Sequence, residues 1–273
     1  MTDQYAVFGF PLKHTKSPRI HQAFAAATAQ VMSYVAIEPP PDGFTEAALN
    51  FRTRGGKGIN ITAPFKLEAY AMATIHEQRA SLAGASNALK FDGNDIIAEN
   101  FDGVGLVRDI RVNLESEIEG RRVLLMGAGG AARGAILTLL ECQPSELVVA
   151  NRTVSKAEGL RELFRPYGEI EACGYPGLGN RAFDIVINAT SASLFGEAPA
   201  VSSTVFGSGC LVYELVYGKG LTPFLLFAKT SGATRLSDGG GMLVEQAAEA
   251  FAWWRGVRPP TRAMIEDIRI PLI

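Results

Sequence analysis

Short apolar runs separated by helix-like segments set the pattern of the second half of this chain. Residues 123–126 and 147–150 are continuous apolar runs, and residues 183–187 are apolar except for Asp184. This pattern indicates strands buried on both faces of a sheet. Residues 210–216 are predicted to form a fourth strand of this kind. Strands that alternate with helices predict a parallel sheet with helices on both faces. We therefore expect a doubly wound α/β domain here.

The first hundred residues mix short strands with amphipathic helices. Ser17 is a good N-cap for a helix whose first turn contains Pro18, and residues 104–114 predict a helix that leads into the second domain. Near the end of the chain we expect a strongly apolar helix at 242–254 and a last helix from Thr261. The strands predicted in this first part are 5–8, 33–37, 59–62, 88–91 and 96–98.

The composition is that of a globular protein, with 273 residues, 47% hydrophobic and 20% charged. This length suits two domains. A net charge of −2 and the absence of a basic run argue against nucleic acid as a partner. The amino terminus does not resemble a signal peptide, and no apolar stretch is long enough to cross a membrane. We expect a cytoplasmic monomer or homodimer without a membrane partner.

Cysteine and histidine show no metal-binding pattern. The cysteines are too scattered for a disulfide framework or a metal knuckle, and the histidines lack ligand spacing. We expect reduced thiols and no metal site. The residues concerned are Cys142, Cys173, Cys210, His14, His21 and His76.

A glycine-rich turn follows the first apolar run of the second half. Gly127, Gly129 and Ala132 have the spacing G-x-G-x-x-A, between a predicted strand and a predicted helix. In a dinucleotide site the first glycine permits the turn and the second lets the backbone approach a pyrophosphate. The small third residue allows helix and strand to pack closely. The motif favours dinucleotide binding over the alternative, a plain glycine-rich connection.

The end of the next strand indicates which dinucleotide. An NAD site normally carries an acidic residue there, but this chain has Asn151, Arg152 and Thr153, with Lys156 close behind. Arg152 can bind a 2′-phosphate through two hydrogen bonds, and Lys156 adds a second positive charge. The sequence therefore favours NADP. The alternative is an ordinary helix cap at Thr153 beside a surface arginine.

Polar residues gather where the strands of the first domain are predicted to end. Because ligands of α/β sheets bind beyond the carboxyl ends of strands, this shared position indicates a substrate site. Each residue alone also has a structural interpretation, such as a helix cap or a solvated charge. The residues are Thr15, Lys16, Ser17, Asn60, Thr62, Lys66, Asn87, Asn100, Phe101 and Asp102.

Taken together and in order, these motifs resemble those of shikimate dehydrogenases. The matching segments are 14–18, 60–66, 84–87, 100–103, 127–131, 151–153 and 241–246. The resemblance covers essentially the whole chain. It implies an N-terminal α/β substrate-binding domain (1–103 with 238–273), a Rossmann-type NADP domain (104–237), and C-terminal helices that pack on the first domain. It also implies the reduction of 3-dehydroshikimate to shikimate with NADPH, on the route to chorismate and the aromatic amino acids.

The resemblance assigns roles to individual residues. Lys66, paired with Asp102, would move the proton at the reacting hydroxyl. The substrate carboxylate would be held by Thr15, Ser17 and Tyr217, and the ring hydroxyls by Asn60, Thr62, Asn87 and Gln246, with Phe101 in the substrate wall. The pyrophosphate would lie on Gly127, Ala128, Gly129, Gly130 and Ala131, the 2′-phosphate near Asn151, Arg152, Thr153 and Lys156, and the nicotinamide near Leu215 and Gly239.

Four positions depart from the family's usual residues. Thr15 replaces a serine, Phe101 and Ala88 replace threonines, and Ser193 stands where glycine is common. A changed substrate wall leaves open the same chemistry on quinate, an aminoshikimate-like compound or another cyclic hydroxy acid. A third possibility is a non-catalytic NADP-binding sensor. If the ring of Phe101 obstructs the substrate, Phe101→Thr should improve shikimate oxidation.

Overall fold

The computed structural model describes residues 2–272, which fold into two units. The first unit contains the chain up to residue 105 together with residues 244–264, and the second contains residues 106–243 together with the chain from residue 265 onward.

The unit boundaries fall inside continuous helices. Helix α5 (Asp102–Arg108) contains the first boundary and helix α9 (Gly240–Arg255) the second. The boundaries expected from the sequence follow residues 103 and 237, so they differ from these by two and six residues. The last segment, which the sequence assigns to the first domain, divides within helix α10 (Arg262–Ile268).

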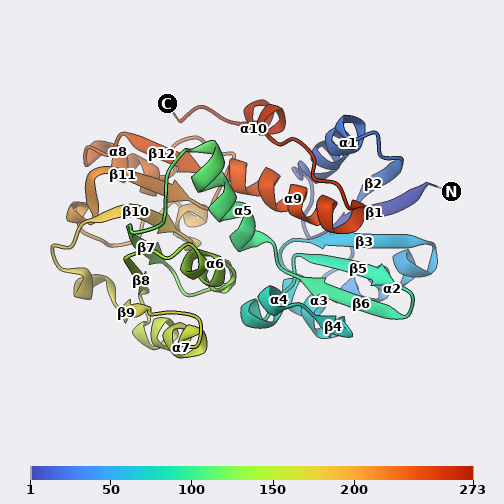
Figure 1. Cartoon of the computed structure of the whole chain (residues 1–273), viewed down its shortest axis with the longest axis horizontal. Helices are drawn as coiled ribbons and strands as arrows, with labels where there is room; N and C mark the ends of the chain where they lie inside the picture. Colours follow the sequence, from blue (N-terminus) through green and yellow to red (C-terminus); the bar gives the residue numbers. More distant parts are fainter. Residues whose placement is uncertain (1, 273) are drawn as a thin grey trace. The chain divides into compact units, whose positions relative to one another are not determined.

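The first unit is built on a six-stranded mixed sheet in the order β2-β1-β3-β5-β6-β4 (Figure 1). Strand β5 is antiparallel to both β3 and β6. The start of β5 therefore lies beside the ends of β3 and β6. The elements are β1 (Asp3–Phe8), α1 (Ser17–Ala27), β2 (Met32–Ile37), α2 (Phe44–Thr53), β3 (Gly56–Ile61), α3 (Lys66–Met72), β4 (Ile75–His76), α4 (Gln78–Ala83), β5 (Ala88–Asp92) and β6 (Asp95–Glu99).

Aromatic side chains fill the core on one face of this sheet. Phe8 and Phe44 meet edge to face with ring centroids 5.9 Å apart, and Phe44 stacks on Phe65 at 5.1 Å. All three are completely buried. Phe65 immediately precedes α3, so the core holds the first residue of that helix, Lys66, at a defined place on the edge of the sheet.

The second unit contains a six-stranded sheet in which every pair is parallel, in the order β12-β11-β10-β7-β8-β9 (Figure 1). This is the Rossmann strand order. The order in which the chain adds strands to the sheet reverses between β7 and β10, while the strands themselves stay parallel. The elements are η1 (Asp109–Asn113), β7 (Arg122–Met126), α6 (Gly130–Glu141), β8 (Glu146–Ala150), α7 (Val154–Phe164), β9 (Glu171–Cys173), η2 (Tyr175–Leu178), β10 (Phe183–Asn188), η3 (Ala192–Phe195), η4 (Ser203–Val205), β11 (Phe206–Glu214), α8 (Pro223–Thr230) and β12 (Arg235–Asp238).

Both faces of this second sheet are buried, as the continuous apolar runs predict. Leu124 and Met126 of β7 pack into the cluster that includes Phe224 and Leu225 of α8. Val123 and Leu125 alternate with them, so they point to the opposite face, and both are completely buried. The fold class expected from the sequence is confirmed.

Some local expectations are wrong. Ser17 is the first residue of α1 and not its N-cap, which is Lys16; the backbone amide of Ser17 instead donates to the Thr15 hydroxyl at 3.4 Å. The helix expected over 104–114 changes to a π-helical turn at Asp109. The short strands β4, β9 and β12 carry too few apolar residues to be predicted from their pattern.

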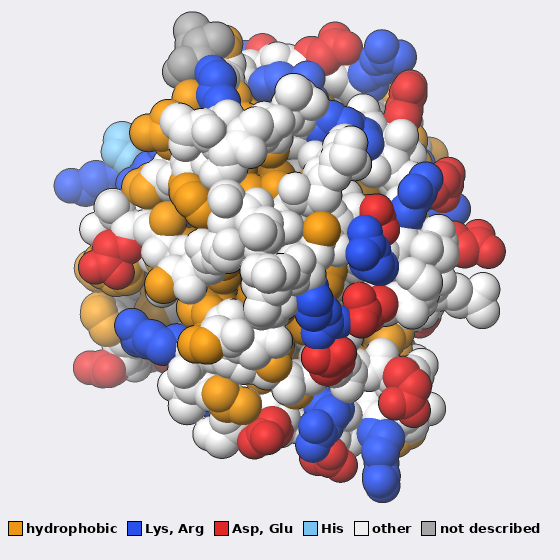
Figure 2. All heavy atoms as spheres, turned by 90° about the vertical axis from the view of Figure 1, so that its left-hand side faces the viewer, with side chains coloured by type: hydrophobic (Ala, Val, Ile, Leu, Met, Phe, Trp, Pro, Cys, Tyr) orange, Lys and Arg blue, Asp and Glu red, His pale blue; other side chains and the backbone are white. Residues whose placement is uncertain are grey.

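In the view of Figure 2, acidic and basic side chains lie next to one another on the right-hand side, and exposed hydrophobic side chains are more frequent on the left. Across residues 2–272, no helix combines the length and the apolar character that crossing a bilayer requires.

Candidate active site

An ion pair lies at the edge of the first unit's sheet. Lys66 opens α3 and Asp102 opens α5, and the Lys66 Nζ donates to Asp102 Oδ2 at 2.6 Å. The Lys66 side chain is 33% exposed and that of Asp102 only 12%. A half-exposed ammonium held by a nearly buried carboxylate can meet a ligand and exchange a proton with it.

Asn87 connects this ion pair to helix α9. Its Nδ2 donates to Asp102 Oδ1 at 2.8 Å and to Gln246 Oε1 at 3.3 Å. Its Oδ1 accepts from the backbone amide of Phe101 at 2.9 Å. Every hydrogen-bonding atom of the amide group has a partner, so the orientation of this side chain is determined. The structure thus brings together four predicted site residues, Lys66, Asp102, Asn87 and Gln246.

A buried acid, Glu99, supports the network through Asn100, and it was not predicted from the sequence. Glu99 ends β6 and is 5% exposed. It accepts from the backbone amide of Asn100 at 2.7 Å and from Arg79 at 2.5 Å. Burial raises the pKa of the Glu99 carboxyl. Asn100 in turn accepts from the backbone amide of Asp102 at 3.1 Å. A charged residue that closes an apolar strand is the signal that could have identified Glu99.

Asn60 is occupied by contacts within the first unit. Its Oδ1 accepts from the Tyr34 hydroxyl at 2.8 Å, and its Nδ2 donates to the backbone carbonyl of Asn87 at 3.3 Å. It is 6% exposed, whereas Thr62, two residues later, is exposed. This geometry makes Asn60 a support for Asn87 and leaves Thr62 accessible to a ligand.

Thr15 and Ser17 form a second polar pair in the first unit. The Thr15 hydroxyl donates to the Ser17 hydroxyl at 3.4 Å, and both residues are half-buried. Two adjacent hydroxyls can both donate to one carboxylate.

The ring of Phe101 is covered by protein. The residue is 3% exposed and belongs to a core cluster with Ala88 and Ala250. Its ring meets that of Trp253 edge to face at 5.7 Å, and the Arg79 guanidinium lies 5.5 Å from its centroid. The ring therefore does not obstruct the polar network, to which Phe101 contributes its backbone amide.

The glycine loop of the second unit has the geometry of an anion site. Gly127 has φ of +109°, and a Cβ there would lie 3.0 Å from the backbone oxygen of Ala189, so the position requires glycine. Gly129 and Gly130 face open space. Helix α6 begins without a side-chain cap, so the amides of its first turn can donate to a phosphate. The loop fits a dinucleotide pyrophosphate. Ala128 is half-buried and Ala131 exposed in the same loop.

Exposed cationic side chains follow the end of β8. Arg152, Thr153 and Lys156 are exposed, and Asn151 donates to the backbone carbonyl of Thr153 at 2.8 Å, which fixes the turn. Arg152 also lies close enough to lower the pKa of Tyr175, although burial dominates and raises it. Two exposed cations beside this turn fit a 2′-phosphate.

The last predicted residues of the second unit follow β11 and β12. A Cβ on Gly239 would lie 2.2 Å from the backbone oxygen of Leu215, so this glycine permits the two segments to touch. Tyr217 is 40% exposed in the loop after β11. It belongs to the second unit, whereas Thr15 and Ser17 belong to the first. Their shared contact with one carboxylate stays a prediction.

A buried carboxylate that the sequence analysis missed ties these loops together. Glu214 ends β11 and is completely buried. It accepts from the Ser193 hydroxyl at 2.6 Å, from Asn188 Nδ2 at 3.0 Å and from the Thr222 hydroxyl at 3.2 Å. Asn188 Oδ1 accepts in turn from Thr190, whose side chain neighbours Gly127. Burial raises the pKa of Glu214.

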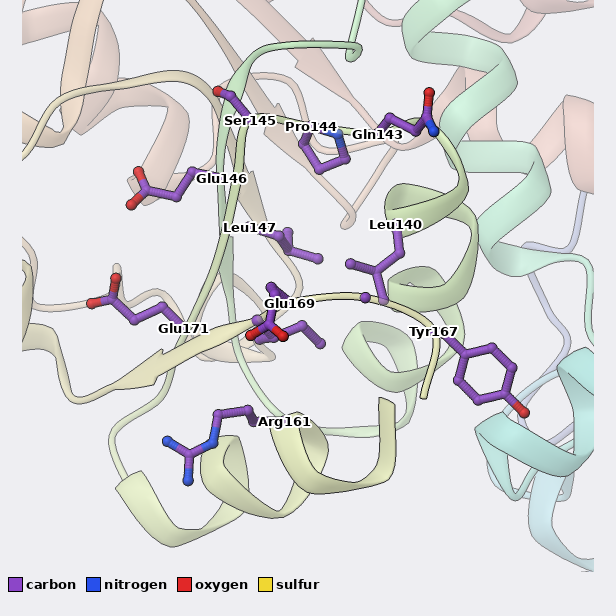
Figure 3. Close-up of a pocket in the computed structure, with 12 residues that line it drawn as sticks. Leu140, Gln143, Pro144, Ser145, Glu146, Leu147, Arg161, Tyr167, Glu169 and Glu171 are labelled. Carbon is purple, nitrogen blue, oxygen red and sulfur yellow. The ribbon is translucent and has the colours of Figure 1, made fainter. Parts of the chain in front are cut away.

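A hollow of about 590 Å³ opens elsewhere on the second unit (Figure 3). It is lined by residues at the amino ends of β8 and β9, among them Glu146, Tyr167 and Glu171. Nucleotides bind at the opposite, carboxyl ends of such strands, and none of the predicted site residues lines the hollow. Within residues 2–272 no group of three or more His, Cys, Asp or Glu side chains has a metal-binding arrangement.

Comparison with protein families gives three matches. The shikimate dehydrogenase substrate binding domain matches residues 7–89, and the shikimate / quinate 5-dehydrogenase model matches residues 110–196. The shikimate 5'-dehydrogenase C-terminal domain matches residues 239–269.

Individual relatives are similar over the full length. The chain is 53% identical over 272 residues to a shikimate dehydrogenase (NADP(+)) from Nitrosospira multiformis, with 100% of this chain and 99% of the relative covered. An Ael1 enzyme from Pseudomonas putida has a crystal structure that matches with a TM-score of 0.97 at 56% identity, over 100% of both chains. The shikimate 5-dehydrogenase from Thermus thermophilus in complex with NADP(H) and shikimate matches with a TM-score of 0.85 at 28% identity, over 97% of this chain and 98% of that one.

Proposed function

This chain belongs to the shikimate dehydrogenase family, and we propose that it interconverts 3-dehydroshikimate and shikimate with NADP as its cofactor. It is thus an oxidoreductase acting on a CH–OH group, on the route to chorismate and the aromatic amino acids. The relatives named above do not favour quinate, another cyclic hydroxy acid or a sensor without turnover.

The ion pair of Lys66 and Asp102 is the observation that carries this function. NADPH, when bound, supplies the hydride for the carbonyl carbon of 3-dehydroshikimate. Lys66 donates a proton from Nζ to the carbonyl oxygen as that oxygen gains negative charge, and takes the proton back in the reverse direction. Asp102 Oδ2, 2.6 Å from Nζ, holds the Lys66 side chain in place.

The other polar side chains orient the substrate. Ring hydroxyls are bound by Thr62, Asn87 and Gln246. Asn60 keeps Asn87 in place by donating a hydrogen bond to the backbone carbonyl of Asn87. The hydroxyls of Thr15, Ser17 and Tyr217 bind the carboxylate. Phe101 contributes through its backbone amide.

On the cofactor side, Gly127 to Ala131 bind the pyrophosphate through backbone amides. Asn151, Arg152, Thr153 and Lys156 surround the 2′-phosphate, and Leu215 and Gly239 lie near the nicotinamide. We infer that the first unit is the substrate domain and that the second unit is the NADP domain. The three cysteines are free thiols, which suits a cytoplasmic location. We propose that the protein is a monomer or a homodimer.

NADPH formation by the purified protein, with shikimate and quinate as parallel substrates, tests this function. We expect kcat/KM for shikimate to exceed that for quinate by a wide margin. Lys66→Ala should lower kcat by roughly a hundredfold or more while NADP binding is retained. Lys57→Ala, an exposed lysine on β3, is the matched control and should keep full activity. A preference for quinate, or NADP binding without turnover on any polyol acid, would contradict the proposal.

A further inference from the structure

The environment of Phe101 links the substrate network to helix α9. The ring is buried among Ala88, Ala250 and Trp253, and Trp253 is its edge-to-face partner at 5.7 Å. Ala250 and Trp253 both belong to α9. The ring therefore forms part of the surface on which this helix rests.

The same face of α9 carries Gln246. Residues 246, 250 and 253 follow the i, i+4, i+7 spacing, which places them on one side of a helix. Gln246 accepts from Asn87 at 3.3 Å, and one turn further along Ala250 packs against Phe101. Any change in how the helix rests on Phe101 will move Gln246 relative to Asn87.

The backbone of Phe101 acts on the other side of the same contact. Its amide donates to Asn87 Oδ1 at 2.9 Å, and the next residue along the chain is Asp102. One residue thus orients Asn87 through its amide and supports the helix that bears Gln246 through its ring.

Ala88 complements the ring. It follows Asn87 on β5, is completely buried, and belongs to the same cluster. A threonine at this position would add two heavy atoms against the Phe101 ring, which close packing does not accommodate. A large side chain at 101 and a small one at 88 therefore form a matched pair.

We propose that Phe101, with Ala88 as its small partner, is a positioning residue of the substrate site that holds α9 so that Gln246 stays hydrogen-bonded to Asn87 beside Asp102. This inference rests on the proposed function only for the identity of the substrate. The sequence left open whether the Phe101 ring obstructs the substrate, and in the structure helix α9 covers the ring.

Three variants test the pair: Phe101→Thr, Ala88→Thr and the double substitution. We expect Phe101→Thr to raise KM for shikimate roughly tenfold, the effect of one misplaced hydrogen-bonding side chain, with KM for NADP unchanged. Ala88→Thr should act in the same direction through crowding. The double variant should be less impaired than the product of the single effects, because contacting residues are not independent.

Two further variants separate positioning from general stability. Phe101→Leu keeps an apolar side chain under α9 and should retain most of the affinity for shikimate. Phe91→Leu truncates another buried ring of the same unit, which belongs to a different core cluster from Phe101, and should lower stability without changing KM.

An NMR measurement on ligand-free protein tests this inference independently of the proposed function. In ligand-free protein, the side-chain amide NMR signals of Gln246 and Asn87 should shift in Phe101→Thr and stay in place in Phe91→Leu. Unchanged signals and an unchanged KM in Phe101→Thr would overturn the positioning role. Effects of Phe91→Leu as large as those of Phe101→Thr would also overturn it. An inactive wild type with shifted signals would contradict only the assignment of shikimate as substrate.

Discussion

At the scale of single residues, His21 is a buried polar group with an unusual environment. It is completely buried, and neither ring nitrogen has a hydrogen-bond partner among residues 2–272. Its ring stacks on that of Tyr34 at 4.0 Å. Tyr34 donates to Asn60, which supports Asn87. His21 thus packs against Tyr34, which supports the substrate network through Asn60. Burial lowers the pKa of His21 to about 3.

This burial predicts a pH-dependent stability. The unfolded chain binds a proton at His21 near pH 6.5, whereas the folded protein does not until about pH 3. Folding therefore loses stability as the pH falls from about 6.5 toward 3, by up to a few kcal/mol, since each pH unit between the two pKa values corresponds to about 1.4 kcal/mol. His21→Phe should lack this component. Urea unfolding at a series of pH values measures it, and parallel curves for the two proteins would refute it.

At the scale of elements, the ends of β10 and β11 and the start of α8 meet at one buried carboxylate. Glu214 receives hydrogen bonds from Asn188, Ser193 and Thr222, and Thr222 also caps α8 by accepting from the amide of Leu225. Serine therefore suits position 193, where the family commonly has glycine. Its hydroxyl connects η3 to the end of β11 through the hydrogen bond to Glu214.

Removing this hydroxyl should destabilise the second unit. Ser193→Ala deletes a hydrogen bond to a buried carboxyl group, which costs about 1.5–3 kcal/mol if the group is charged. Thermal and urea unfolding measure this loss. Ser203→Ala, an exposed serine of η4, is the control and should change stability by no more than about 0.5 kcal/mol. Equal, small effects of both substitutions would mean that Glu214 does not need Ser193.

At the scale of the whole molecule, the polar network around Lys66 belongs to one unit and the glycine loop to the other. Two units with separate cores need not unfold together. We therefore expect each ligand to stabilise mainly the unit that binds it, which a segment-by-segment measurement can detect.

Hydrogen exchange can detect this division. NADP should slow amide exchange in the second unit, around residues 127–131 and 151–156, and shikimate should slow it in the first unit, around residues 62–66 and 100–102. Arg152→Ala should weaken the effect of NADP but not that of shikimate. Its cost of about 1.5–3 kcal/mol should raise KM for NADP far more than KM for NAD. Protection of the same segments by both ligands, or equal changes in both KM values, would contradict these assignments.

The sequence by itself determined the parallel sheet of the second unit, the turn at Gly127 and the sheet edge at which Lys66 and Asp102 lie. These features are local in origin: continuous apolar runs specify doubly buried strands, and polar residues that flank the strands lie at the same edge of the sheet. For this reason Lys66, Asn87 and Asp102 could be grouped before their distances were known.

Only the tertiary structure decided which way Phe101 points, what occupies Asn60, and that Glu99 and Glu214 are buried supports of the two sites. Each of these depends on a partner far away in the chain, such as Trp253 for Phe101 or Tyr34 for Asn60. The strand pattern places a residue at an edge of the sheet, but the direction of its side chain depends on the volume that distant elements leave. At position 101 helix α9 provides an apolar surface, and the phenylalanine ring packs against it.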